Sequence, residues 1–552
     1  MTRLSQPLPT ATWPAELHGT RSRRLFVAGI CALVLLLLFE VVTISRQAPW
    51  QDEIFVVSTG LSLARSRPPI MSVMAQYPRT DSPIQFYGPV SFEAEAQLIR
   101  WFGLSIAAWR LTCFGGVLLT LLLSAMLVKL AGGDRWAQLA TALIIALAGS
   151  FGSTLPGRWD AVTSGLFLCG LLFLLRGVEV GGKALLWRTL LAGVFLGLAL
   201  SSTPRTLTLI TATAITSLLV AVRFRKQRKS LLLGTAGMFV VAVSVQSLLL
   251  LPWGLNTLSW YAYVRQATKE DGINATSVAG EGAYDFVLHY HKTFVLVLLL
   301  LLLIGGLGAI AQTKSRSADE KVPLKIFLTL FATVNLALML LLLAQALGQS
   351  AYWLPPVVIA MMCWFNWDTL KTKALGPLVA ALVAACLLVL LFADIQRLTP
   401  VVLTWNRRSN ADLTAFVRRT VKRNAVVYGP ASGNFYPVEM AGAEYLWLSE
   451  RARAGRYSEP HASISDKLEQ EICTHPTYAM WPKPDIAHQP EQEPMPEVLR
   501  EHLLPKAGEF NQPPLSPWKE KLLNDIGPML GKYGYPDAIL YPLKSLDDCG
   551  RH

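Results

Sequence analysis

The pattern of apolar positions divides the chain into two unequal parts. Up to about position 395, long apolar runs alternate with short polar segments. A helix of about 20 residues crosses the roughly 30 Å hydrocarbon core of a membrane at 1.5 Å per residue. The runs therefore predict eleven membrane-spanning helices, at residues 25–45, 106–128, 135–151, 160–176, 186–201, 205–222, 231–252, 292–312, 324–346, 351–366 and 373–394.

The last part of the chain, residues 396–552, follows a different pattern. It is polar, charged and rich in proline, with helical periodicity at 410–421 and a strand-like run at 425–428. This order predicts a small α/β domain. The proline-rich residues 482–517 are expected to be extended. The predicted fold class is therefore an all-α polytopic membrane protein with a small C-terminal α/β domain.

Positive charge in the loops predicts the orientation, because cytoplasmic loops carry an excess of Lys and Arg. If residues 1–24 form a cytoplasmic tail, the loops on the same side all contain cations, at residues 129–135, 176–188, 223–229, 314–325 and 371–373. An odd number of spans then delivers the C-terminal domain to the outer face. Two spans decide this parity, since the junction at Pro204 also fits one kinked helix and the span before Asn366 is short. We expect the bacterial inner membrane, with the C-terminal domain periplasmic or extracellular.

Composition agrees with this architecture and removes one class of function. The chain of 552 residues is 52% hydrophobic and 16% charged, whereas an average soluble domain is about 25% charged. The net charge of +13 comes mostly from Lys and Arg in loops, so it reports topology and predicts no nucleic-acid partner. Of the seven cysteines, only Cys473 and Cys549 lie outside the apolar part, and they are candidates for a disulfide on the oxidising side.

Two predicted outer loops, residues 46–105 and 253–291, stand out by their length. Long loops in compact folds are usually functional. The first loop holds a stretch at 83–102 that mixes aromatic residues with Glu93, Glu95 and Arg100. We expect this stretch to form an interfacial or re-entrant helix.

Several polar residues of the apolar part and its outer loops are candidates for chemistry. Asp52 and Glu53 follow the first predicted helix, where a carboxylate pair can act as a general base, can ligate a hard cation or can simply be solvated. Glu40 lies inside the first apolar run and either reaches water or a neighbouring helix, or belongs to a polar cavity. His289 and His291 precede the eighth span, where they are candidates to contact phosphate or a metal.

The order of motifs in the first outer loop resembles a known family. Asp52 and Glu53 are followed by a segment with Pro and Tyr at 77–89 and then by WFGLSIAAWRL at 101–111. This succession resembles the first outer loop of the GT-C glycosyltransferases, which include protein O-mannosyltransferases and lipid A aminoarabinose transferases. The phrase at 101–111 matches a family phrase that enters the second helix.

Two further matches extend the resemblance over most of residues 25–395. Arg158 and Asp160 form an Arg-x-Asp motif like the one that opens the fourth helix of the family at the outer face. Tyr352, in the sequence YWLPP, resembles a helix start near the lipid-phosphate site of the family.

The resemblance implies transfer of a sugar from a polyprenyl-phosphate donor to an acceptor, which is a lipid, a glycan or a protein, with inversion at the outer leaflet. It implies Asp52 as the catalytic base. Glu53 and Asp160 complete the catalytic set, either by positioning substrates or, for Asp160 together with Asp52, by holding a divalent metal ion. No other cofactor is implied.

The cation for the donor phosphate departs from the family pattern. Where many relatives carry a Lys- or His-bearing segment, this chain has residues 80–83, TDSP. Arg79 and Arg158 are the candidates for this cation, and Tyr352 is expected at the same phosphate. The residues expected to line the substrate cavity are Tyr87, His289 and His291.

Two alternatives from other classes stay open. A secondary transporter is also polytopic, but it typically shows repeated halves, interrupted helices and midplane charges, whereas the polar residues here gather at one face. A catalytically inactive GT-C-fold partner in an envelope assembly is the second alternative, and retention of the acidic and Arg-x-Asp motifs argues against it.

Overall fold

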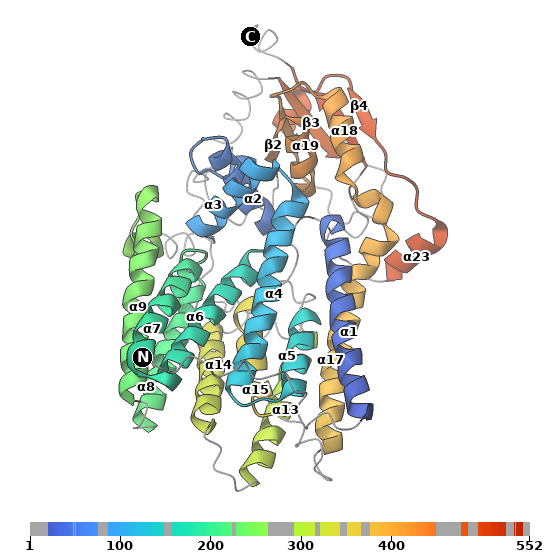
Figure 1. Ribbon diagram of the computed structural model, residues 1–552. Coiled ribbons are helices and arrows are strands. Elements are labelled where there is room, and N and C mark those ends of the chain that lie inside the picture. The colour runs from blue at the N-terminus through green and yellow to red at the C-terminus, as the bar shows by residue number, and fades with distance from the viewer. Residues whose placement is uncertain are drawn as a thin grey trace, which may run out of the picture.

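A computed structural model gives the arrangement of the elements (Figure 1). The structure describes residues 20–47, 49, 51–74, 87–147, 157–223, 228–262, 292–314, 321–342, 350–365, 376–448, 476–483, 495–525, 535 and 537–544.

Each of the eleven predicted spans contains a helix. These helices are α1 (Thr20–Thr43), α4 (Ile106–Leu130), α5 (Arg135–Leu147), α6 (Asp160–Val180), α7 (Gly182–Leu200), α8 (Thr206–Arg223), α9 (Arg228–Leu250), α13 (Lys292–Lys314), α14 (Val322–Leu342), α15 (Leu354–Met362) and α17 (Gly376–Leu403). In the described part of the chain, eight helices are long and apolar enough to cross a membrane. The protein is an integral membrane protein with several transmembrane helices.

The sequence left two of the predicted spans open, and both affect whether the number of spans is odd. The structure confirms two helices at the first of these places and shortens the helix at the second. A turn separates α7 from α8 at Pro204, so the two runs form two helices rather than one kinked helix. The run at 351–366 forms only the nine-residue α15, which is about 14 Å long and less than half the hydrocarbon thickness. All nine of its residues are buried, so α15 is a short core helix and the prediction of a full span there was too long.

Small residues let the helices of the bundle approach closely. A Cβ added at Gly193 or Gly197 of α7 would lie 2.4 Å and 2.6 Å from Val241 and Val245 of α9, respectively. Lipid tails are as apolar as the helix surfaces, so association in a membrane depends on such close packing rather than on hydrophobic burial.

Two helices outside the bundle cover one of its ends. The predicted interfacial helix at 83–102 is α3 (Pro89–Phe102), and it packs on α2 (Gln51–Ala64), which the sequence analysis treated as loop. Figure 1 shows both helices beside the C-terminal sheet. We call this end of the bundle the sheet-bearing end.

The C-terminal region confirms the predicted mixture of helices and strands. Its sheet has the order β2-β1-β3-β5-β4, formed by β1 (Val426–Gly429), β2 (Glu444–Trp447), β3 (Thr477–Pro482), β4 (Gly508–Phe510) and β5 (Ala538–Pro542). β1 is parallel to β2 and β3, while β5 is antiparallel to β3 and β4. The helices of this region are α18 (Asn410–Thr420), α19 (Phe435–Ala441), α22 (Glu497–Glu501) and α23 (Pro517–Asp525). The prediction that residues 482–517 are extended is wrong at α22, which is helical, whereas β4 in the same stretch is an extended strand.

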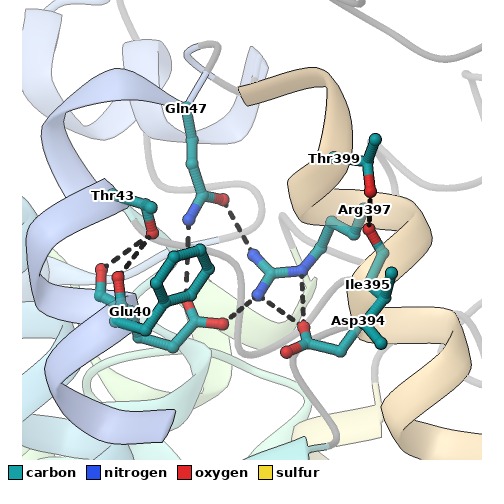
Figure 2. Close-up of polar contacts among 8 residues, drawn as sticks. Glu40, Thr43, Gln47, Asp394, Ile395, Arg397 and Thr399 are labelled. Atoms are coloured by element: carbon teal, nitrogen blue, oxygen red, sulfur yellow. Dashed lines mark hydrogen bonds and ion pairs between the residues drawn. The ribbon is translucent and has the colours of Figure 1, made fainter. Parts of the chain in front are cut away.

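A buried polar network joins α1 to α17 near the sheet-bearing end (Figure 2). The Arg397 guanidinium forms ion pairs with Glu40 and Asp394 and donates a hydrogen bond of 2.8 Å to Oε1 of Gln47. Gln47 in turn donates to Glu40. The intramembrane Glu40 therefore reaches a neighbouring helix, which was one of the two alternatives for this residue.

We predict that Arg397→Ala destabilises the protein by about 3–5 kcal/mol, because removal of one partner leaves Glu40 and Asp394 buried without their cation. Arg176→Ala is the control, since the Arg176–Glu179 pair is exposed and such pairs contribute about 1 kcal/mol or less. Thermal unfolding in detergent micelles measures both. An equal loss for the two variants would show that the α1–α17 network does not stabilise the fold.

Candidate active site

Asp160, the first residue of α6, is the centre of a buried polar cluster. Oδ2 accepts hydrogen bonds from Nε of Arg158 at 2.8 Å and from the Tyr87 hydroxyl at 3.2 Å. Oδ1 accepts one from the Tyr352 hydroxyl at 2.5 Å, and Nη1 of Arg205 lies 3.8 Å from it. The side chain of Asp160 is fully buried. The fold therefore brings together four of the residues predicted from sequence, and it adds Arg205.

This cluster places two guanidinium groups against one carboxylate. Arg158 is nearly fully buried, and Arg205 is about four-fifths buried. Cations with little access to water attract an anion more strongly than solvated ones, because the local dielectric constant is low. Guanidinium and tyrosine hydroxyl groups are donors that suit phosphate oxygens. The arrangement is thus chemically fit to bind a phosphate group.

A small cavity of about 10 Å³, room for about one water molecule, adjoins the cluster. It is lined by residues of α4, α5, α6 and α15 and by the turn before α15. Ala161 and Ser164 of α6 line it, together with Thr120 and Ser350. Most of the other lining residues are apolar. The cavity therefore lies within the bundle, next to the buried start of α6.

Glu53 belongs to a second cluster, in which its carboxylate is fully engaged. Nε and Nη2 of Arg110 each donate to it at 2.9 Å, and the hydroxyl of Tyr436 donates to Oε1 at 2.8 Å. Nη1 of Arg110 also donates to the backbone oxygens of Ile44 and Gln47, at 2.7 Å and 2.8 Å. Bidentate guanidinium–carboxylate pairs have a specific geometry, so Arg110 and Tyr436 together hold the Glu53 side chain in one position.

Tyr436 comes from α19 of the C-terminal region and enters the site as a neutral donor. Burial, followed by the negative charge of Glu53, raises the pKa of Tyr436 well above its usual range. Its hydroxyl therefore stays protonated at physiological pH and can donate only while the C-terminal region is docked.

Gly157 separates the two clusters and allows them to lie close together. Its φ is +90°, and a Cβ at this position would lie 2.4 Å from both Cδ and Oε2 of Glu53. The Gly157 carbonyl accepts a hydrogen bond of 2.9 Å from Nε1 of Trp109, whose ring stacks on Trp159 at 5.3 Å. The glycine thus places the Arg158–Asp160 turn directly against the Glu53–Arg110 pair.

We predict that Gly157→Ala destabilises the protein clearly more than Gly442→Ala. Both glycines have a φ of +90°, where alanine is strained by roughly 1–2 kcal/mol. Of the two, only Gly157 would also bring its new Cβ into a steric clash, with Glu53, since nothing lies within 4 Å of a Cβ at Gly442. The difference between their thermal unfolding temperatures measures the contact with Glu53, and equal shifts would mean that the pair moves aside freely.

Glu95 of α3 is buried, although the sequence analysis grouped it with the polar residues of an interfacial helix. Its side chain packs against Gly60 of α2. Among the described residues, its Oε2 has no hydrogen-bond partner. Burial, followed by the nearby Glu53 carboxylate, raises the pKa of Glu95 well above its usual range, which favours the neutral acid.

An ion pair between Arg65 and Glu439 fastens α19 to the end of α2. Nη2 of Arg65 lies 2.9 Å from Oε2 of Glu439, and Oε1 accepts a hydrogen bond from the backbone N–H of Tyr445 at 3.0 Å. Burial raises the pKa of Glu439 from 4.5 to about 7; Arg65 lowers it, and Glu444 adds to the increase. This joint therefore titrates near neutral pH.

We predict a pH dependence of stability from Glu439. Its pKa of about 7 in the folded state lies above the unfolded value of 4.5, so the folded state binds the proton more tightly. This contribution, about 3 kcal/mol, is fully present below pH 4.5 and is lost as the pH rises through 7. Unfolding temperatures between pH 5 and 8 should fall more steeply for the wild type than for Glu439→Gln. Parallel curves would contradict the assignment.

The remaining predicted residues are only partly described. Asp52 is the second residue of α2, adjacent to Glu53, but its side chain lies outside the described part. Arg79, His289 and His291, and the predicted disulfide between Cys473 and Cys549, also lie outside the described residues.

Three residues of the two clusters were not identified as site residues from sequence. Arg110 and Arg205 had a detectable signal, because each is a single cation at the start of an apolar helix. Tyr436 had none, since it lies in the C-terminal region, 383 positions after its partner Glu53.

Asp160 does not fit the predicted metal site with Asp52. Both of its oxygens already accept hydrogen bonds, and two guanidinium groups lie where they would repel a divalent cation. Within the described ranges, no group of three or more His, Cys, Asp or Glu side chains could hold a metal ion.

Comparisons with known proteins bear on the fold. No protein-family model and no curated protein matches the sequence. Among solved structures, ArnT from Cupriavidus metallidurans bound to undecaprenyl phosphate is 14% identical, with a TM-score of 0.51 over 85% of this chain and 94% of that chain. An Archaeoglobus fulgidus oligosaccharyltransferase tethered with an acceptor peptide is 14% identical, covering 82% and 69%, with a TM-score of 0.43. The arabinofuranosyltransferase AftD from Mycobacteria is 13% identical, covering 94% and 41%, with a TM-score of 0.45.

The likeness to ArnT, which extends over nearly the full length of both chains, shows that this protein has the fold of the GT-C glycosyltransferases. The predicted resemblance to this superfamily is thereby confirmed at the level of fold.

Proposed function

We propose that this protein is a glycosyltransferase that moves a sugar from a polyprenyl-phosphate donor to an acceptor at the sheet-bearing end of the bundle. The observation that carries the proposal is the Asp160 cluster, in which Arg158, Arg205 and two tyrosine hydroxyls meet at the buried start of α6. The GT-C fold and the undecaprenyl phosphate of the ArnT structure support it.

The cluster has the donors that a departing phosphate needs. In the proposed reaction the acceptor oxygen forms a bond to the anomeric carbon, and the bond from that carbon to the phosphate oxygen breaks. Polyprenyl phosphate then leaves with one more negative charge, which Arg158, Arg205 and Tyr352 stabilise. Donors fixed in advance in a dry site stabilise such developing charge strongly. A single displacement of this kind inverts the anomeric carbon.

The exposed apolar surface of the bundle helices suits the part of the donor that follows the phosphate. The cavity next to Asp160 is too small for it, since it has room for about one water molecule. An isoprenoid chain prefers such an apolar surface or the lipid itself to water, so the donor phosphate can remain at the cluster while its tail stays in apolar surroundings.

We propose Asp52 as the base that accepts the acceptor's proton. It precedes Glu53 on α2, and the Glu53–Arg110 pair fixes the first turn of that helix against α4. The two guanidinium groups of the Asp160 cluster supply positive charge for the phosphate, so no step of the proposal requires a metal ion.

We also propose that the sheet-bearing end faces the periplasm of a bacterial inner membrane. The cationic loops predicted as cytoplasmic support this orientation. The donor phosphate and the C-terminal region would then lie on the same side, opposite to those loops.

The test is sugar transfer by the purified protein from a panel of radiolabelled polyprenyl-phosphate sugars to membrane extracts. We predict that Asp52→Asn lowers kcat by about 100-fold or more, as loss of a general base does. Arg158→Ala should lower kcat/KM by a comparable factor, because one phosphate donor is lost.

Arg176→Ala is the matched control and should transfer sugar like the wild type, because Arg176 pairs with Glu179 away from the Asp160 cluster. If the folded wild type uses no donor, the transporter or the inactive partner becomes the better interpretation. If Asp52→Asn is as active as the wild type, another group is the base.

A further inference from the structure

The short helix α23 of the C-terminal region exposes an apolar pair. Trp518 is 60% exposed and Leu522 is 41% exposed. Residues four apart lie on the same face of a helix, so the two side chains form one patch. Leu523 is fully buried and fixes the other side of α23 to the protein. A single exposed apolar side chain needs no explanation, so the meaning of this pair depends on where α23 lies.

α23 lies beside α17, at the level where α1 ends (Figure 1). The segment before it is held there by a hydrogen bond of 2.7 Å from Nε of Arg407 to the carbonyl of Pro513. α17 has 28 residues, which makes it about 42 Å long, so it exceeds the roughly 30 Å of hydrocarbon by about two turns. One of its ends therefore extends into the head-group region, and α23 packs against this helix.

The lipid-facing surface of α17 reaches toward the level of α23. Leu388, Phe392, Ile395 and Val402 are all about half exposed or more, and their spacing places them along one side of the helix. Val402 lies beyond Arg397, on the side of the sheet. Apolar surface therefore continues past the charged network that joins α1 to α17.

We propose that α23 is an interfacial anchor that binds the lipid leaflet at the sheet-bearing end. Trp518 and Leu522 enter the boundary between acyl chains and head groups, where tryptophan is enriched in membrane proteins. Lys519, whose Nζ lies 5.7 Å from the centroid of the Trp518 ring, and the exposed Lys521 contact lipid phosphates. The inference does not depend on the proposed sugar transfer.

The size of the patch favours lipid over a protein partner. Buried aromatic side chains contribute about 150–250 Å² each, so one tryptophan and one leucine supply well under the roughly 800 Å² per partner of a stable protein interface. A lipid leaflet needs no such area, because the transmembrane helices already hold the protein in the bilayer.

The experiment places the photoreactive amino acid p-benzoylphenylalanine at position 518 or 522 of the full chain, in vesicles whose phospholipids carry an alkyne-tagged acyl chain. The matched control is position 415, an exposed alanine on α18, which Figure 1 shows beside the strands and farther from the transmembrane helices than α23. Illumination should transfer the lipid tag at 518 and 522 and give only background at 415. Each labelled protein must elute and unfold like the wild type before illumination.

Background labelling at both 518 and 522 would overturn the proposal. So would crosslinks from these positions to a second copy of the chain or to an added protein. Labelling at 415 as strong as at 518 would also overturn it, because the contact would then not be specific to α23.

Discussion

The buried pair of Glu53 and Arg110 is the interaction on which the arrangement of the sheet-bearing end depends. A single guanidinium holds the carboxylate of α2 and two carbonyl groups of the segment after α1, while it belongs to α4. Charges removed from water are costly unless their hydrogen-bonding capacity is met. The buried Arg110 guanidinium donates hydrogen bonds to all of these acceptors at once. The start of α2 and the segment before it are therefore fixed relative to the bundle.

The Asp160 cluster is also built from buried charges, but its ratio of cations to carboxylates differs. The Glu53–Arg110 pair is balanced in charge, whereas Asp160 faces two arginines. The first cluster pairs one carboxylate with one guanidinium, and the second places two guanidinium groups near one carboxylate. Since Gly157 lies between the two, the Glu53–Arg110 pair supports the turn that carries the charged cluster. This division explains why Glu53 and Asp160, which the sequence presents as similar candidates, have different surroundings.

The sequence predicted the parts of this structure that depend on local pattern. The apolar runs gave the helices, and the resemblance to the GT-C superfamily identified Arg158, Asp160, Tyr87 and Tyr352, which the fold brings together. The pairing of Glu53 could not be predicted, because its partners lie 57 and 383 positions away. The fourteen-residue α2 was missed because it is too short for a span and follows one directly. The short α15 was overestimated, since apolar residues of a buried helix and of a span have the same pattern.

The bond from Tyr436 to Glu53 also has a consequence for the order of biosynthesis. A ribosome releases α1, α2 and α4 long before α19, so Glu53 and Arg110 can meet while most of the chain is still unmade. Domains generally fold as units, the N-terminal parts first. The Tyr436 hydroxyl can donate its hydrogen bond to Glu53 only after all the transmembrane helices described here have been synthesised and the C-terminal region has docked. The C-terminal region, which is synthesised last, thus supplies the final hydrogen bond to a cluster whose other members belong to the N-terminal part. In a nascent or truncated protein without this region, Glu53 lacks the hydrogen bond from Tyr436.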